Sequence, residues 1–124
     1  MARILIADDD PDYLSAFTEG LSVVGHDIRG VTTGSEAIAE LDGGTFDLVF
    51  LDVFMQGGGA ITLIHDVSRV APGVPIVVIT GKAGMLDSPI LKDGMRLASA
   101  KIAKTATLSS LDQLVHRLTR ASRT

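Results

Sequence analysis

Five polar side chains each follow, or end, a short apolar run of this sequence. They are Asp8, Asp9, Asp52, Thr80 and Lys104. Three crowded carboxylates repel one another, and a hard divalent cation relieves that repulsion. A carboxylate beside such an ion can attack phosphorus and form an aspartyl phosphate. The residue types therefore indicate metal-assisted phosphoryl transfer, provided that the fold brings the five side chains together.

The lysine and the threonine suit the same chemistry. A lysine supplies a compact positive charge that can pair with a phosphoryl oxygen, and a hydroxyl can donate to another. Ligands that are all oxygen favour Mg²⁺, or Mn²⁺, over zinc. Each feature alone has an ordinary structural explanation, because a strand-end Asp, Thr or Lys is common, so the prediction depends on all of them occurring together.

The apolar runs read as buried parallel strands, and helical patterns separate them. The expected strands cover residues 4–7, 26–31, 47–53, 75–80 and 100–103. Strands that alternate with helices predict an α/β fold with a parallel sheet and right-handed crossovers. In such sheets ligands bind outside the carboxyl ends of the strands, where all five polar side chains are expected.

The helices are expected from caps and apolar spacing. The first begins at Pro11 with Asp10 as its N-cap, and carries an apolar stripe through Leu14, Phe17, Leu21 and Val24. The second is capped by Ser35 and the last by Thr107. Pro72-Gly73 ends the third, and Ser88-Pro89 opens the fourth.

Composition narrows the class of protein. The 124 residues fit one domain, expected to span 1–124 with a frayed tail over 121–124. A net charge of −4 argues against a nucleic-acid partner. Without cysteine there is no disulfide framework, and no apolar run approaches the roughly 18 residues that span a bilayer. We therefore expect no membrane insertion and a cytoplasmic location.

Four motifs, in the same order, resemble the receiver domain of two-component response regulators, in particular the single-domain, chemotaxis-regulator-like form. They are ILIADDDPD, LVFLDVFM, PIVVIT and the segment around Lys104, and together they cover essentially the whole chain. The resemblance implies a flavodoxin-like, doubly wound, five-stranded parallel sheet in the order 2-1-3-4-5, with helices on both faces.

The resemblance also assigns roles to residues. It implies that Asp52 is the phosphoacceptor, that Thr80 is the switch hydroxyl and that Lys104 binds the phosphoryl group. It implies that Asp8, Asp9, Asp52 and the backbone carbonyl of Phe54 hold Mg²⁺, with Asp9 the more direct ligand of the first pair.

Three positions depart from the family pattern. Thr105 replaces the proline that usually follows the lysine, and Gln56 replaces the one that usually follows Met55. Lys101 replaces the aromatic residue that usually moves with the switch threonine. We expect these changes to leave the phosphorylation chemistry intact. The usual coupling between the switch threonine and an aromatic side chain cannot operate in its ordinary form.

The implied partners are a sensor histidine kinase or a phosphotransfer protein, and a downstream protein target. The protein is expected to be no enzyme beyond its own phosphotransfer and dephosphorylation. The alternative is a pseudo-receiver, a binding or dimerisation module without a phosphoryl cycle. A phosphatase is disfavoured, because Phe54 stands where such enzymes need an acid. His26, His65 and His116 are interpreted as unpaired surface or packing residues.

Overall fold

The computed structural model describes residues 2–53, 55, 60–81 and 96–122. Its five strands are β1 (Arg3–Ala7), β2 (Asp27–Val31), β3 (Leu48–Asp52), β4 (Ile76–Thr80) and β5 (Ala100–Ala103). They form one sheet, all parallel, in the order β2-β1-β3-β4-β5. The predicted fold class and strand order are confirmed.

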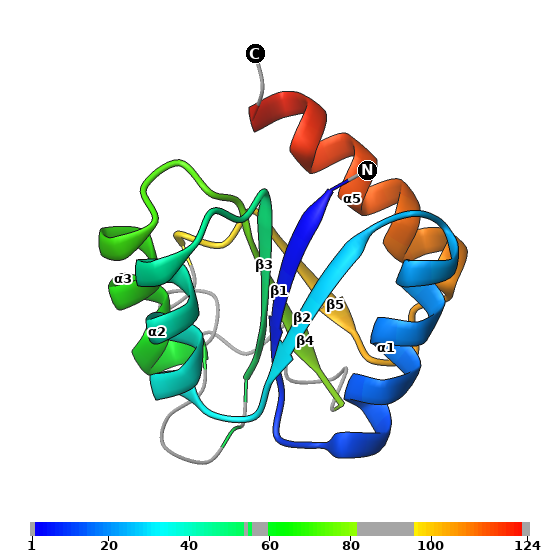
Figure 1. Ribbon diagram of the computed structural model, residues 1–124, viewed down its shortest axis with the longest axis horizontal. Coiled ribbons are helices and arrows are strands. Elements are labelled where there is room, and N and C mark those ends of the chain that lie inside the picture. Colours follow the sequence, from blue (N-terminus) through cyan, green and yellow to red (C-terminus); the bar gives the residue numbers. More distant parts are fainter. Residues whose placement is uncertain (1, 54, 56–59, 82–95, 123–124) are drawn as a thin grey trace.

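Helices cover both faces of this sheet (Figure 1). The described residues contain α1 (Pro11–Val23), α2 (Gly34–Gly43), α3 (Ala60–Val70) and α5 (Leu108–Ser122). Helices α1 and α5 lie on one face, and α2 and α3 lie on the other. The helix expected to open at Ser88-Pro89 falls outside the described residues. Helix α5 reaches Ser122, so it continues into the tail that was expected to fray.

Each face of the sheet has its own apolar core, because successive strand residues point to opposite sides. Leu5, Val49 and Val78 pack toward α2 and α3. Ile4, Phe50 and Ile79 pack toward α1 and α5, and every residue of β3 and β4 is buried. This burial on both faces explains the continuous apolar runs of these strands.

Capping residues set where the helices begin. Asp10 accepts hydrogen bonds from the amides of Asp12 and Tyr13, and Thr107 accepts one from the amide of Ser110, as predicted. The expected cap at Ser35 is wrong. Thr33, two residues earlier, adopts an extended conformation and accepts from the amide of Glu36. Glu36 in turn accepts from the Thr33 hydroxyl, so the two side chains support each other.

The end of α1 also differs slightly from the expected pattern. Phe17 and Leu21 are buried, but Val24 is 46% exposed and serves as the C-cap instead of extending the apolar stripe. Gly25 follows with φ +99°, a left-handed conformation that glycine adopts without a steric cost. This turn leads the chain directly into His26 and β2.

Candidate functional site

The carboxyl ends of four strands deliver the predicted side chains to one edge of the sheet. Asp8 follows β1, Asp52 ends β3, Thr80 ends β4 and Lys104 follows β5 by one residue. Oxygen atoms of Asp8, Asp9 and Asp52 all lie within 4.8 Å of one another. The structure thus brings together side chains from opposite ends of the chain, as the strand order requires.

The three carboxylates differ in their exposure to solvent. Asp8 is fully buried and Asp52 is 4% exposed, whereas Asp9 is exposed. Asp8 Oδ1 accepts a hydrogen bond from the amide of Asp10 at 2.9 Å. Placing two buried carboxylates beside a third costs free energy, because burial and mutual repulsion disfavour their charged forms unless positive charge compensates.

Lys104 supplies part of that positive charge. Its Nζ atom lies 2.7 Å from Asp8 Oδ2 and 3.8 Å from Asp52 Oδ2. Burial tends to lower the pKa of Lys104, but the contact with Asp8 and the charge of Asp52 outweigh it, so that its pKa is raised. The lysine is therefore an ammonium at any physiological pH.

The missing proline does not displace this lysine. Among the described residues no peptide bond is cis, so the bond between Lys104 and Thr105 is trans. The Lys104 amide donates to the Thr80 carbonyl at 2.8 Å, which extends the pairing of β4 with β5. The backbone thus positions the lysine without the cis-proline of the family pattern.

Thr80 is fully buried at the end of β4, and Lys101 is exposed on β5. The register of these strands pairs Thr80 with Ala103 and Val78 with Lys101. An exposed lysine thus occupies the position where the family pattern has an aromatic side chain that moves inward. Phe54, whose carbonyl was expected to be a metal ligand, falls outside the described residues.

Tyr13 is a residue of the site that sequence reasoning missed. Lys104 Nζ lies 4.8 Å from the centre of its ring, within the range of a cation–π contact. Its hydroxyl is buried and has no hydrogen-bond partner among the described residues. Burial, with the charges of Asp8 and Asp52, raises the pKa of Tyr13 to about 12. A signal was available in the sequence, because Tyr13 lies one helical turn after the acidic cluster.

The donor set fits a hard divalent cation. Three carboxylates and one ammonium leave two negative charges in a largely buried space. Asp8 Oδ2 is buried and forms an ion pair with Lys104, and among the described residues this pairing leaves the oxygen able to accept a further ligand. Carboxylate oxygens in this number suit Mg²⁺, which keeps several water ligands.

The interpretation of the histidines as unpaired is wrong for two of them. His26 and His116 both contact Asp112, at the opposite end of the sheet from the acidic cluster. Sequence reasoning missed this group because His26 and Asp112 are far apart in the chain. His65 is exposed on α3, as expected.

Comparisons with known proteins agree on one family. The family model described as "Response regulator receiver domain" matches residues 4–116. The transcriptional regulatory protein TcrA of Mycobacterium tuberculosis is 30% identical over 92 residues, which are 74% of this chain and 36% of TcrA. The chain spans little more than a third, or less, of the curated relatives that it matches.

Solved structures agree on the fold. A CheY-like receiver domain protein from Methanospirillum hungatei superposes with a TM-score of 0.88 at 23% identity, covering 99% of this chain and 97% of that one. The response regulator TrrA of Thermotoga maritima, solved in complex with Mg²⁺ and BeF, gives 0.83 at 24% identity, covering 95% and 99%. At these identities the likeness concerns the fold alone.

Proposed function

This chain belongs to the response regulator receiver domain family of two-component systems, and from that premise we propose that Asp52 accepts a phosphoryl group. The observation that carries the proposal is the convergence of three carboxylates and one ammonium at the carboxyl edge of the sheet. The donor would be a phosphohistidine of a sensor kinase or of a phosphotransfer protein.

In the proposed transfer an oxygen of the Asp52 carboxylate attacks the phosphorus atom. The bond between phosphorus and the donor nitrogen breaks, its electron pair stays on the imidazole, and a new P–O bond forms on Asp52. Little covalent chemistry is left for the protein, so catalysis is a matter of positioning and charge. Receiver domains are signalling domains, and we propose that this one catalyses only its own phosphotransfer and dephosphorylation.

Lys104 and Thr80 would stabilise the transferred group. The ammonium lies 3.8 Å from Asp52 Oδ2, close enough to pair with an oxygen of a phosphoryl group on that carboxylate. The buried Thr80 hydroxyl, on the neighbouring strand, would donate to another oxygen. Movement of these two side chains toward the phosphoryl group would begin the switch.

Asp9 and Asp52 would hold Mg²⁺ directly, with Asp8 acting partly through water and the Phe54 carbonyl completing the protein ligands. When bound, the ion neutralises charge on the phosphoryl oxygens. Support for this choice of ion comes from the all-carboxylate donor set and from the Mg²⁺ complex of the TrrA structure. Mn²⁺ satisfies the same ligands.

The output of the switch would be a protein contact. Lys101 is exposed on β5, at the position where the family pattern has an aromatic residue, and places one positive charge there. Relatives such as TcrA are named as transcriptional regulators, and this chain matches 36% of the length of TcrA. The described residues include no helix long and apolar enough to cross a membrane, and we propose a cytoplasmic location.

The proposal is tested by intact-protein mass after incubation with Mg²⁺ and acetyl phosphate. The native chain should gain one phosphoryl group and Asp52→Asn none. Asp42→Asn, an equal change of charge at an exposed position of α2, should behave as the native chain does. No gain in the native chain, together with no Mg²⁺ binding, would instead favour the pseudo-receiver.

A further inference from the structure

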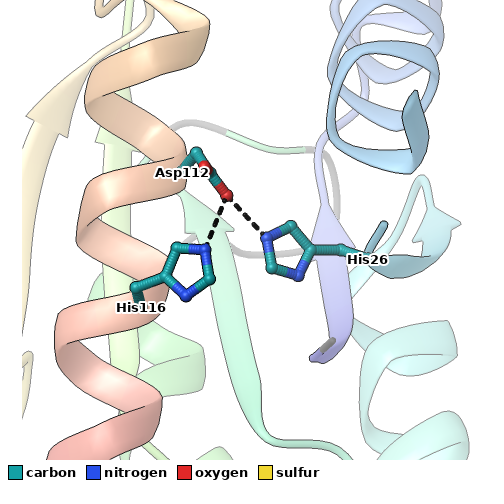
Figure 2. A group of neighbouring side chains, drawn as sticks. All are labelled: His26, Asp112 and His116. Carbon is teal, nitrogen blue, oxygen red and sulfur yellow. Dashed lines mark hydrogen bonds and ion pairs between the residues drawn. The ribbon is translucent and has the colours of Figure 1, made fainter. Parts of the chain in front are cut away.

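A second group of metal-ligating side chains lies far from the acidic edge. His26 precedes β2, while Asp112 and His116 are one turn apart on α5 (Figure 2). Because His26 lies at the amino end of a strand and Asp52 at the carboxyl end of one, the two groups occupy opposite ends of the parallel sheet. The proposed phosphorylation chemistry makes no use of this group.

The two imidazoles converge on a single carboxylate oxygen. His26 Nε2 lies 2.8 Å from Asp112 Oδ1, and His116 Nε2 lies 3.3 Å from the same atom. Figure 2 shows both rings turned toward Asp112, and their centres are 5.5 Å apart. All three ligand atoms lie within 4.8 Å of one another.

These separations match those around a metal ion. Two ligand atoms that are each about 2.1 Å from an ion lie about 3.0 Å apart at a right angle and about 3.4 Å apart at the tetrahedral angle. The separations of 2.8 and 3.3 Å between the imidazole nitrogens and Asp112 Oδ1 differ from these values by a few tenths of an ångström or less. An ion could therefore enter with small side-chain movements.

The three side chains differ in their exposure, so that the group is both anchored in the fold and open to an ion from solvent. The side chain of His26 is 2% exposed, that of Asp112 is 29% exposed and that of His116 is 56% exposed. One ligand is thus fixed in the interior, while the outermost can turn to admit an ion. Spacing of i and i+4 on a helix places Asp112 and His116 on the same face.

We propose that His26, Asp112 and His116 bind a zinc-type divalent transition metal ion, with water in the remaining coordination position. Two imidazoles and one carboxylate are ligands of the class that Zn²⁺ takes, and they distinguish this site from the all-oxygen Mg²⁺ site. The ion would tie α5 to the turn between α1 and β2. This inference does not depend on the proposed phosphorylation of Asp52.

Binding requires one defined rearrangement. The amide of Ala2 donates a hydrogen bond to His26 Nδ1 at 3.1 Å, so in the neutral ring the proton is on Nε2 and is donated to Asp112. A metal ion needs the lone pair of Nε2. The ring proton must then move to Nδ1, and the Ala2 amide loses its acceptor. A change of His26 tautomer is therefore a signature of binding at this site.

The test is titration of the native chain with Zn²⁺ in excess Mg²⁺, which is added to compete for the proposed carboxylate site. We expect one Zn²⁺ to bind per chain. His116→Ala should lower the Zn²⁺ affinity by at least about tenfold, because even loss of a residue that only supports a metal ligand lowers metal affinity by about that factor. His65→Ala, a change at an exposed histidine that belongs to neither group of ligands, should bind as the native chain does. Long-range ¹H–¹⁵N correlation spectra should show the His26 proton on Nε2 before addition of Zn²⁺ and on Nδ1 after it.

Three results would overturn the inference. They are the absence of Zn²⁺ binding by the native chain, equal affinity of the native chain and His116→Ala, and retention of the Nε2 proton of His26 at saturation. Because the His116 side chain is more than half exposed, its alanine variant should remain folded, and a far-ultraviolet circular dichroism spectrum checks this.

Discussion

The Nζ atom of Lys104 lies 2.7 Å from Oδ2 of Asp8 and more than an ångström farther, at 3.8 Å, from Oδ2 of Asp52. The ammonium thus forms ion pairs with both carboxylates, and the shorter one is with the fully buried Asp8 and not with the proposed phosphoacceptor. A phosphoryl group on Asp52 would bring new negative charge to the ammonium. We expect Lys104 to exchange one partner for the other, which couples phosphorylation to the surroundings of Asp8.

Substitution of Lys104 should change metal binding and phosphorylation in opposite directions. Lys104→Met removes the positive charge that competes with a cation, so Mg²⁺ affinity should rise by roughly fivefold or more, the factor that corresponds to ~1 kcal/mol between unit charges about 4 Å apart in water. The rate of phosphorylation by acetyl phosphate should fall. Calorimetry and mass spectrometry measure the two quantities. A parallel fall of both would mean that the lysine only supports the fold.

The pKa of Tyr13 reports the burial of its ring and the negative charge of the neighbouring carboxylates. Tyr13 is the single tyrosine of the chain, so phenolate absorbance in the near ultraviolet reports it alone. The midpoint should lie near pH 12 and not near 10, because burial and the charges of Asp8 and Asp52 favour the neutral hydroxyl. In Asp52→Asn the midpoint should fall, but only in part, since burial remains.

The sign of the accompanying stability change follows from the same shift. The folded chain holds the Tyr13 proton to higher pH than the unfolded chain does. Stability from this group is complete below about pH 10 and is lost as the pH rises through about 12. Circular dichroism recorded beside the absorbance separates titration in the folded chain from unfolding. A midpoint near 10 while the chain remains folded would contradict the described burial of the ring.

Asp9 is the carboxylate of the cluster that can be changed with the least damage, because it is exposed. Asp9→Asn should weaken Mg²⁺ binding by about tenfold or more, in line with losses at metal sites, and should leave the thermal midpoint without Mg²⁺ almost unchanged. Asp12→Asn is the matched control, since it removes the same charge from the exposed first turn of α1. Equal effects of the two variants on Mg²⁺ affinity would point to general electrostatics and not to ligation.

Two substitutions at the start of α2 distinguish the observed N-cap, Thr33, from Ser35, the N-cap that the sequence suggested. Thr33→Ala removes the acceptor for the Glu36 amide and should reduce the free energy of unfolding by about 1 kcal/mol. Ser35→Ala should change it by a few tenths at most. Urea denaturation of both variants measures the difference. A larger loss in Ser35→Ala would mean that the helix begins two residues later than described.

Much of the fold could be predicted because β3 and β4 are buried on both faces. Such strands need continuous apolar residues, and the first residue with a charge or a hydroxyl marks their carboxyl ends, as Asp52 and Thr80 do. The order of the strands came from the family resemblance. Helix boundaries were less certain, since Thr33 and Ser35 are both good caps and only the backbone conformation chooses between them.

Contacts between distant segments could not be read from the sequence. The pairing of His26 with Asp112 depends on how α5 crosses the sheet, and neither residue belongs to a local motif. Tyr13 was overlooked for a related reason, because its contact with Lys104 joins the first helix to the end of the last strand. Local spacing predicts elements, whereas such contacts follow from the packing of elements against one another.

The most direct test of the central claim is to locate the acyl phosphate by chemical trapping. Borohydride reduction of the phosphorylated chain, followed by peptide mass spectrometry, should convert residue 52 to homoserine and leave Asp8, Asp9 and Asp47 unchanged. Omission of Mg²⁺ should greatly reduce the product. Homoserine at another aspartate, or a phosphorylated chain with residue 52 unmodified, would contradict the assignment of Asp52 as the phosphoacceptor.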